Sequence, residues 1–336
     1  MDIVTTATIR ERIEALEAAA LRPEATRAAA SRGRVRPEDP HPFRTAFQRD
    51  RDRILHSKAF RRLAHKTQVF LAPEGDHYRM RLTHTLEVVQ VARTIARALC
   101  LNEDLVEAIC LGHDVGHTPF GHLGEEVLTE FLGRPFRHSE QSLRILDALE
   151  TRAGERGLNL TWEVRDGILN HTWSMPQPGT LEAKVARYAD RIAYINHDID
   201  DAIRGGVLTE DDLPPETRRV LGETSSARVD AMVGAMVQAS EGADDILMAA
   251  DVFEVLMATR VFLFERVYKR PEVVPEQERT RVLLRTVCDH YRRHADELPV
   301  LGDPGDDPET RLADYVAGMT DRFARREYER ITGERP

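Results

Sequence analysis

The sequence predicts an all-α protein, and three observations support this fold class. Apolar residues recur at three- and four-residue spacing in almost every segment, which is the periodicity of an amphipathic helix. No convincing run alternates apolar and polar residues with the period that a half-buried strand needs. Hydrophobic residues make up 41% of the 336 residues, so the helices can bury a core.

The periodic segments fall into three parts. Residues 1–43 form a leader with an amphipathic helix from Thr6 to about Ala20, followed by a Pro-rich break. Residues 44–208 hold nearly all of the histidines, on helices separated by PEGD, GHTPFGHLGE, GRPF and SMPQPGT, and form the candidate catalytic core. Residues 209–336 hold long helical patterns, expected either to pack on the core and offer an assembly surface or simply to pack within the chain.

The bulk composition excludes several classes of protein. A formal net charge of -10 argues against a general attraction to nucleic acid, so any phosphate site must be local. No apolar run approaches the ~20 residues needed to span a bilayer, and the N-terminus is too charged for a signal peptide, so a cytoplasmic location is expected. Cys100, Cys110 and Cys288 lie in apolar helical patterns without CxxC spacing, which predicts buried reduced thiols.

The strongest local motif is LGHDVGHTPFGHLGEE. A helix from Glu103 delivers His113 and Asp114 at its end, before Gly116 breaks it. A His beside an Asp is weak evidence alone, because residues 197–198 repeat the pair in an ordinary helical setting. The pair therefore needs support from elsewhere in the chain.

Two further helices supply that support. His84 lies near the N-terminal end of one, and Asp190 lies in the middle of another. Taken singly, His84 can be a polar residue near a helix start, and Asp190 a surface carboxylate paired with a neighbouring arginine. Together with His113 and Asp114 they offer two imidazoles and two carboxylates, a donor set that suits Mn, Fe, Zn or Mg and leaves positions open for water and phosphate. The lack of cysteine ligands argues against a structural zinc site.

More histidines follow the His-Asp pair. His117, His122 and Glu125 lie on the loop shaped by Gly and Pro, and His138 lies further along in FRHSEQSLRIL. Imidazoles there can protonate or hydrogen-bond phosphate oxygens, and a carboxylate beside a histidine can tune it as an acid or base. The alternative is that His122 caps the next helix and that His138 lies at the surface.

One helix stripe adds groups suited to a nucleotide. Asp190, Tyr194 and Asp198 recur at i, i+4 and i+8, so a phenol and a second carboxylate share a face with the metal ligand. A phenol and a carboxylate can bind a sugar hydroxyl. The cations that a polyphosphate needs, unless they are solvated surface groups, are Arg81, Arg187 and Arg191.

Several blocks together resemble the bacterial deoxyguanosinetriphosphate triphosphohydrolase family of the HD-domain superfamily, from about Asp50 to near the C-terminus. The HD pair alone is shared by the whole superfamily, whereas the QVF and AGMTDR blocks are typical of the dNTPase branch. The matching blocks are DRDRILHSKAFRRLAHKTQVF, RLTHTLEVVQVAR, HDVGHTPFGHLGEEVL, FRHSEQSLRIL, ADRIAYINHDIDDA and DYVAGMTDRFA.

The resemblance implies an HD-domain helical core and a set of roles. The metal positions of the family match His84, His113, Asp114 and Asp190. The catalytic histidine and acid match His122 and Glu125, and histidines lining the phosphate side match His117 and His138. A glutamine that meets the deoxyribose 3′-hydroxyl matches Gln68, and groups around the triphosphate and sugar match Arg81, Arg191, Tyr194 and Asp198. Relatives often carry Asp or Lys at position 191.

The resemblance further implies hydrolysis of a deoxynucleoside triphosphate to the deoxynucleoside and tripolyphosphate, by attack of water on the α-phosphorus. The implied cofactor is a divalent metal ion, Mn or Mg first, with Fe, Zn, Ni or Co as alternatives. The implied partners are the dNTP substrate, a dNTP activator between subunits and further copies of the chain, hexamers among the assemblies. The short segment between His138 and Asp190 leaves open whether dGTP or several dNTPs are used. Nucleic acid binding is left open, and no membrane partner is expected.

The rival functions are other HD-domain phosphohydrolases and a regulator without catalysis. A 5′-nucleotidase or a phosphodiesterase of the HD superfamily shares the same metal motif. Cyclic-dinucleotide enzymes carry a GYP signature that the chain lacks, and stringent-response hydrolases follow the pair with acidic residues where this chain has VGH. A dNTP-sensing regulator with a vestigial site would have lost a ligand, and none is lost here.

Overall fold

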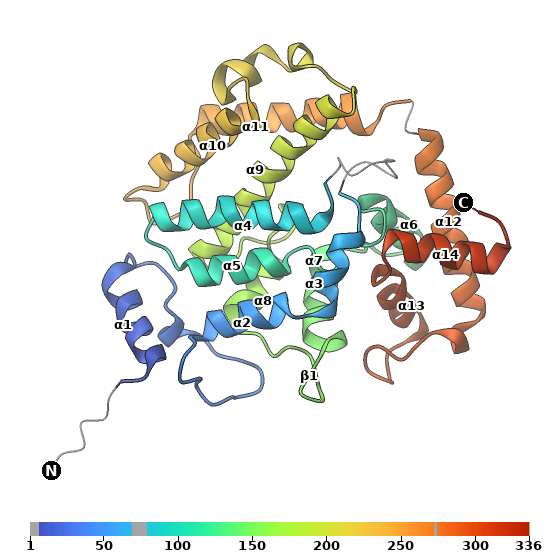
Figure 1. The fold of residues 1–336 in the computed structure, drawn as a ribbon, viewed down its shortest axis with the longest axis horizontal. Coiled ribbons are helices and arrows are strands. Elements are labelled where there is room, and N and C mark those ends of the chain that lie inside the picture. Colours follow the sequence, from blue (N-terminus) through green and yellow to red (C-terminus); the bar gives the residue numbers. More distant parts are fainter. Residues whose placement is uncertain (1–6, 69–78, 272–273, 336) are drawn as a thin grey trace.

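The computed structural model describes residues 7–68, 79–271 and 274–335, and helices dominate it, which confirms the all-α prediction (Figure 1). The α-helices are α1 Ile9–Ala20, α2 Ala46–Leu55, α3 Lys58–Arg62, α4 Arg81–Ala98, α5 Glu103–Gly112, α6 His122–Leu132, α7 His138–Arg144, α8 Trp162–Leu169, α9 Leu181–Arg204, α10 Ser225–Ser240, α11 Ala250–Leu263, α12 Val274–Arg293, α13 Pro308–Ala317 and α14 Asp321–Thr332. Short 3₁₀ or π turns cover Ala28–Ala30, Leu63–His65, Ile145–Leu149, Glu210–Asp212, Thr217–Leu221, Phe264–Tyr268 and Ala295–Glu297. A small hairpin pairs β1 Thr151–Arg152 with β2 Glu155–Arg156.

The N-terminal helix begins later than the sequence pattern indicates. Thr8 caps α1, and its side chain and that of Glu11 form a reciprocal capping box. The predicted start at Thr6 lies outside the described residues. The leader is tied to the core because Thr26 donates its N–H and hydroxyl to the Glu182 carboxylate at the start of α9, at 2.9 and 2.8 Å. The segment boundaries at residues 43 and 208 stay predictions.

Three helices form the centre of the molecule. α4 packs on both α5 and α9, and α5 also packs on α2, α8 and α9, so α2, α5 and α4 are stacked in Figure 1. The side chain of Asn102 caps the first turn of α5. Beyond that turn α5 is apolar nearly all round, and Leu105, Val106 and Ile109 are fully buried. A helix buried on every side fixes its C-terminal end in the interior.

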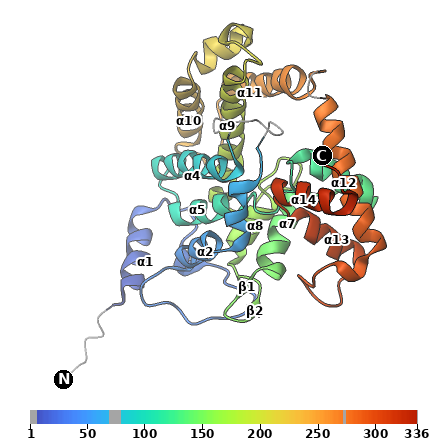
Figure 2. The ribbon, with the colours of Figure 1, turned by 45° about the vertical axis from the view of Figure 1, so that its right-hand side comes forward.

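The C-terminal helices build a second core. Apolar side chains of α12, α13 and α14 pack on α6, with Val287, Val316 and Ala324 at most 1% exposed. These helices lie together at one side of the molecule in both views (Figure 2). The sequence pattern over residues 309–330 is interrupted at Gly318, which ends α13. Packing within the chain therefore accounts for much of these apolar stripes.

The cysteine prediction is only partly right. Cys110 and Cys288 are buried and free, as expected. Cys100 is exposed, because α4 has already ended and the chain turns there with a φ of 51°. Among the described residues, no helix is long and apolar enough to cross a membrane.

Gly116 sets how closely the turn after α5 approaches α7. A Cβ at this position would lie 2.1 Å from the Ser142 nitrogen and 2.6 Å from the His138 carbonyl oxygen, both backbone atoms. The Gly116 N–H also donates to the Ser142 hydroxyl at 2.9 Å, and that hydroxyl donates to the His113 carbonyl at 2.7 Å. Because Gly116 has no side chain, the turn after α5 can contact the backbone of α7, which begins at His138.

Gly116→Ala is expected to lower the free energy of unfolding, measured by urea denaturation, by about 1–3 kcal/mol or more, because backbone atoms cannot move aside as a side chain can. Gly234→Ala in α10 is the matched control, since a Cβ there meets no described atom within 4 Å. The control should gain about 0.5–1 kcal/mol from its better helix propensity. Equal stability of Gly116→Ala and the wild type would contradict this account.

Candidate functional site

The predicted metal ligands come from three helices that pack on one another. His84 lies in the first turn of α4, His113 directly follows α5, and Asp190 lies in the middle of α9. The His113 Nδ1 lies 2.6 Å from the Cys110 carbonyl oxygen, which can only accept, so Nδ1 carries the proton. Its Nε2 is left with a lone pair facing the other ligands.

The four predicted ligands converge. The His84 Nε2 lies 3.2 Å from the Asp190 Oδ1, and the His113 Nε2 lies 3.7 Å from the same oxygen. The His113 Nε2 is also 3.6 Å from the Asp114 Oδ1, and it has no hydrogen-bond partner among the described residues although it is buried. His84, His113 and Asp114 place one ligand atom each within 4.8 Å of one another. An unpaired buried imidazole nitrogen between two carboxylates fits a divalent cation.

Electrostatics keep both carboxylates charged. Burial opposes ionisation of Asp114, but its neighbours His113 and Arg81 hold its pKa well below the usual range. Burial likewise opposes ionisation of Asp190, but the hydrogen bond from His84 and the neighbouring His113 lower its pKa. Arg81 is paired directly with Asp114, at 2.7 Å from its Nη1 to the Oδ2. Both groups are thus available as anionic ligands.

A second group of polar side chains surrounds Glu125. The His122 Nδ1 lies 2.9 Å from the Glu125 Oε2, and the His138 Nδ1 lies 2.6 Å from the Oε1, which also accepts the His138 N–H. The ring of His117 stacks on that of His138 with centroids 4.1 Å apart. His138 is mostly buried, so the surface alternative is wrong for it, whereas the side chain of His122 is 75% exposed at the first position of α6.

The pKa shifts in this group follow from the same contacts. Burial, aided by the charges of Arg81 and His138, lowers the pKa of His117 well below its usual range. Burial opposes protonation of His138, yet the carboxylate of Glu125 raises its pKa. The pKa of Glu125 is held well below normal, against the effect of burial, by the charges of His138 and His117. Glu125 is therefore an anion that orients two imidazoles.

His171 belongs to the same site and was missed from the sequence. It directly follows α8 and its C-cap residue, and its Nε2 lies 3.1 Å from the His138 Nε2. Burial lowers its pKa to about 3. Asp114, His138 and His171 also place ligand atoms within 4.8 Å of one another. A lone histidine after a helix has no local spacing that marks it, so only the packing of α8 on α5 and α7 reveals it.

Two positions predicted to contact the substrate, Tyr194 and Asp198, form hydrogen bonds within the protein. The Tyr194 hydroxyl accepts from the Arg260 Nε at 3.0 Å, and the Asp198 carboxylate accepts a short hydrogen bond from the Tyr268 hydroxyl. Burial raises the pKa of Asp198 to about 7. Arg260 and Tyr268, from α11 and the turn after it, were not found from the sequence, because nothing local links them to α9.

The remaining predicted cations are held by the protein itself. Arg191 lies over the ring of Trp173, 4.2 Å from its centroid, and is 7% exposed. Arg187 donates to the carbonyl oxygens of Pro176 and Met175. The interpretation of these arginines as solvated surface is therefore wrong. The side-chain Oε1 of Gln68 is buried without a partner among the described residues.

His197 contacts the candidate metal ligand His84, whereas the sequence indicated an ordinary helical residue. Its Nδ1 lies 3.5 Å from the His84 Nδ1, and its Nε2 lies 2.5 Å from the Glu87 Oε2. Through His197, the Glu87 carboxylate thus orients the imidazole of His84.

The C-terminal helices are tied to the site by buried polar contacts. The Lys66 ammonium, 1% exposed, donates a short hydrogen bond to the His117 carbonyl and another to the Ala317 carbonyl at 2.9 Å. Burial lowers its pKa to about 7. The Asp321 carboxylate accepts from the Thr67 N–H at 2.9 Å and from the Phe120 N–H at 3.0 Å.

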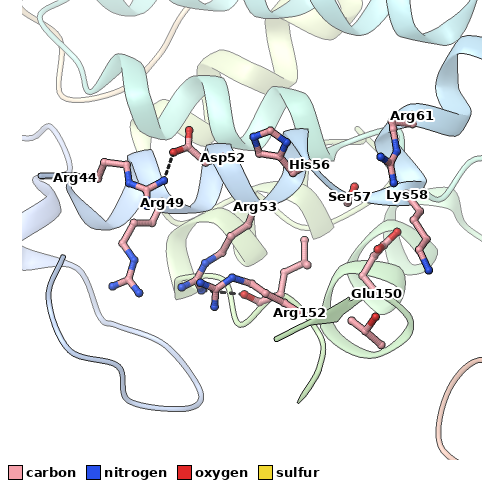
Figure 3. Close-up of a pocket in the computed structure, with 12 residues that line it drawn as sticks. Arg44, Arg49, Asp52, Arg53, His56, Ser57, Lys58, Arg61, Glu150 and Arg152 are labelled. Atoms are coloured by element: carbon pink, nitrogen blue, oxygen red, sulfur yellow. Dashed lines mark hydrogen bonds and ion pairs between the residues drawn. The ribbon is translucent and has the colours of Figure 1, made fainter. Parts of the chain in front are cut away.

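A basic cavity of about 290 Å³ lies along α2, α3 and the hairpin, and none of the candidate-site histidines lines it (Figure 3). Arg44 is paired with Asp52 there, and Arg53 with Glu38. Lys58 and Arg61 form no ion pair with any described residue. The cavity therefore offers two uncompensated cations to an anionic ligand.

Two family models match the chain: the HD domain over residues 81–195 and the phosphohydrolase-associated domain over residues 246–330. Among curated proteins, a deoxyguanosinetriphosphate triphosphohydrolase-like protein of Caldanaerobacter subterraneus subsp. tengcongensis is 51% identical, covering 96% of this chain and 95% of its own. Proteins of the same description from Desulfatibacillum aliphaticivorans and Clostridium perfringens (strain 13 / Type A) are 49% and 45% identical, each covering 96% of this chain and 98% and 97% of their own.

Among solved structures, a hypothetical protein from Aquifex aeolicus aligns with a TM-score of 0.46 and 20% identity, covering 84% of this chain and 71% of its own. The curated relatives, in contrast, match over nearly their full length, and the HD-domain model spans His84, His113, Asp114 and Asp190. The chain belongs to the deoxyguanosinetriphosphate triphosphohydrolase-like family of HD-domain hydrolases.

Proposed function

We propose that the protein is a metal-dependent triphosphohydrolase that converts deoxynucleoside triphosphates, dGTP or several dNTPs, to the deoxynucleoside and tripolyphosphate. The observation that carries the proposal is the convergence of His84, His113, Asp114 and Asp190 beside a second polar group centred on Glu125. The relatives are described as deoxyguanosinetriphosphate triphosphohydrolase-like proteins. This description favours a triphosphohydrolase over a 5′-nucleotidase, a phosphodiesterase or a nucleotide-sensing regulator.

The four converging residues would hold one divalent ion, Mn or Mg first. When bound, such an ion lowers the pKa of water and polarises a phosphoryl oxygen. Arg81 keeps Asp114 charged through their ion pair. His122 is exposed at the start of α6 and is fixed by Glu125, so it can exchange a proton with a substrate bound above the site. His117 and His138 contribute hydrogen bonds to the phosphate side.

The deoxyribose and triphosphate are assigned to the face formed by α9 and α11. The buried, unpaired Oε1 of Gln68 can accept from a sugar hydroxyl. Tyr194 and Asp198 present a phenol and a carboxylate on the stripe that carries Asp190. The guanidinium of Arg260, bonded to Tyr194, adds a cation to the proposed phosphate contacts of Arg81 and Arg191.

Loss of a ligand is expected to remove the metal without unfolding the protein. His113→Ala and Asp114→Asn should reduce the bound metal, measured by elemental mass spectrometry after dialysis against Mn, and should abolish turnover. Asn has nearly the same shape as Asp, so the substitution leaves no cavity beside Arg81. His290→Ala is the control, because His290 lies on α12 and bonds to Glu297. Wild-type metal content and turnover in both site variants would contradict the site.

The bond that breaks is tested with labelled solvent. If water attacks the α-phosphorus, hydrolysis in ¹⁸O-water must place the label in tripolyphosphate and not in the nucleoside. His122→Ala should lower kcat by about 10²–10⁴, the range for a lost positioned proton-transfer group, while the metal stays bound. Label in the nucleoside hydroxyl, or release of a nucleoside mono- or diphosphate, would overturn the mechanism even if the metal site holds.

We further propose that the chain works in the cytoplasm as a homo-oligomer, with hexamers among the expected assemblies, and that a dNTP activator binds in the basic cavity. Lys58 and Arg61 supply the cations for its phosphates. Lys58→Glu and Arg61→Glu should then abolish any stimulation of turnover of one dNTP by a second dNTP. Arg97→Ala, with a side chain 71% exposed, is the control. Undiminished stimulation in both cavity variants would place the activator elsewhere.

A further inference from the structure

A row of three polar side chains leads from the surface of the molecule to the candidate metal ligand His84. Glu87 lies three residues after His84 on α4, and its side chain is 39% exposed. The Glu87 Oε2 lies 2.5 Å from the Nε2 of His197, on α9, and the Nδ1 of that ring lies 3.5 Å from the His84 Nδ1. Both histidines are buried, so Glu87 is the member of the row that meets solvent.

The direction of these hydrogen bonds follows from what each group can donate. A carboxylate only accepts, so the His197 Nε2 carries a proton, and the Nδ1 of the neutral ring presents a lone pair to His84. The His84 Nδ1 is then the donor between the two rings, which meet edge to face with centroids 5.6 Å apart. The opposite nitrogen of His84, its Nε2, lies 3.2 Å from the Asp190 Oδ1 and is the atom that can bind a metal.

An imidazole that donates its second N–H is a stronger metal ligand. The hydrogen bond fixes the tautomer and the plane of the ring, and it raises the basicity of the other nitrogen. His113 meets this condition through the Cys110 carbonyl. His84 differs, because its acceptor is a second imidazole whose own proton is held by a carboxylate. The charge of Glu87 can therefore act on His84 through two successive hydrogen bonds.

Arg79 shares the same carboxylate. Its Nε lies 3.2 Å from the Glu87 Oε2 and 3.3 Å from the Oε1, so the oxygen that accepts from His197 also accepts from a guanidinium. Arg79 is held in this place by Asp201, 2.7 Å from its Nη1, and Asp200 lies 3.6 Å from its Nη2. A cation on the shared oxygen withdraws negative charge from the hydrogen bond to His197.

We propose that Glu87 and His197 are positioning residues that set how tightly the protein holds a metal at His84, and that Arg79 weakens their effect by sharing the Glu87 carboxylate. The inference rests on the proposed function for the presence of a metal at His84. Loss of a group that orients a ligand histidine costs about 10–100-fold in metal affinity. The two partners of the Arg79–Glu87 ion pair should thus change metal affinity in opposite directions, although they stabilise each other at the surface.

Metal affinity is measured on the full chain, stripped with chelator and titrated with Mn, with free Mn read by electron paramagnetic resonance. We expect Glu87→Gln to bind Mn about 10–100-fold more weakly than the wild type, and Arg79→Gln to bind it more tightly. Glu103→Gln is the control and should bind as the wild type does, because it breaks ion pairs with Arg93 and Arg97 on the same helix, α4. Weaker binding in both Glu87→Gln and Arg79→Gln would mean that the ion pair only stabilises the fold, and would overturn the proposal.

A double-mutant cycle separates the path through His197 from a direct effect of charge. His197→Phe keeps a ring between α4 and α9 and removes both hydrogen bonds. If Glu87 acts through His197, Glu87→Gln should hardly change the Mn affinity of the His197→Phe variant. The full effect of Glu87→Gln in that background would show that its charge acts through space, and would contradict the role of His197.

A spectroscopic measurement controls for variants that fold poorly. With one equivalent of Co(II) bound, the Nδ1–H protons of His84 and His113 should each give a hyperfine-shifted, exchangeable resonance in proton NMR. Glu87→Gln should move the His84 resonance and leave that of His113, whose acceptor is the Cys110 carbonyl, in place. An unmoved His84 resonance would refute the proposal while the proposed function stands. If the wild type binds no metal at all, the proposed function fails as well.

Discussion

The buried negative charge of Asp114 is the constraint on which the site depends. An unpaired carboxylate this far from water would cost several kcal/mol, so cations or hydrogen-bond donors must surround it. The protein meets this need with Arg81 from α4 and with His113 from the end of α5. Both partners are available only because α4 and α5 pack closely along their length. The helix packing and the charge balance therefore stabilise each other.

Nearly all of the histidines in the site lie at helix ends. His113 follows α5, His122 and His138 begin α6 and α7, and His171 follows α8. Helix ends suit this purpose because they leave backbone carbonyls such as those of Cys110 and Ile168 close to the imidazole, where they accept its Nδ1–H. The chain thus uses backbone groups to fix the tautomers of His113 and His171.

The sequence was sufficient for the fold class, and it identified four residues that the structure brings together, His84, His113, Asp114 and Asp190. Helical periodicity is a local property, so it predicts the helix that precedes His113, although α5 ends at Gly112 and not just before Gly116. His171, Arg260 and Tyr268 could not be found in this way, because their roles arise from α8 and α11 packing on distant helices. The roles of Arg187 and Arg191 were unreadable for the same reason, since Trp173 and backbone carbonyls hold them.

Lys66 and Asp321 have a consequence for any attempt to divide or recombine this chain. The segment from residue 81 to residue 195 carries the candidate metal ligands, yet the loop that presents His117 is anchored by the Lys66 ammonium, which also binds the carbonyl of Ala317. Without α13 and α14, that ammonium would lose one of its two carbonyl acceptors, and the N–H groups of Thr67 and Phe120 would lose the Asp321 carboxylate. A chimaera that joins the HD segment of one relative to the C-terminal helices of another must therefore keep both halves of these contacts. The HD segment and its own C-terminal helices should thus be transferred together.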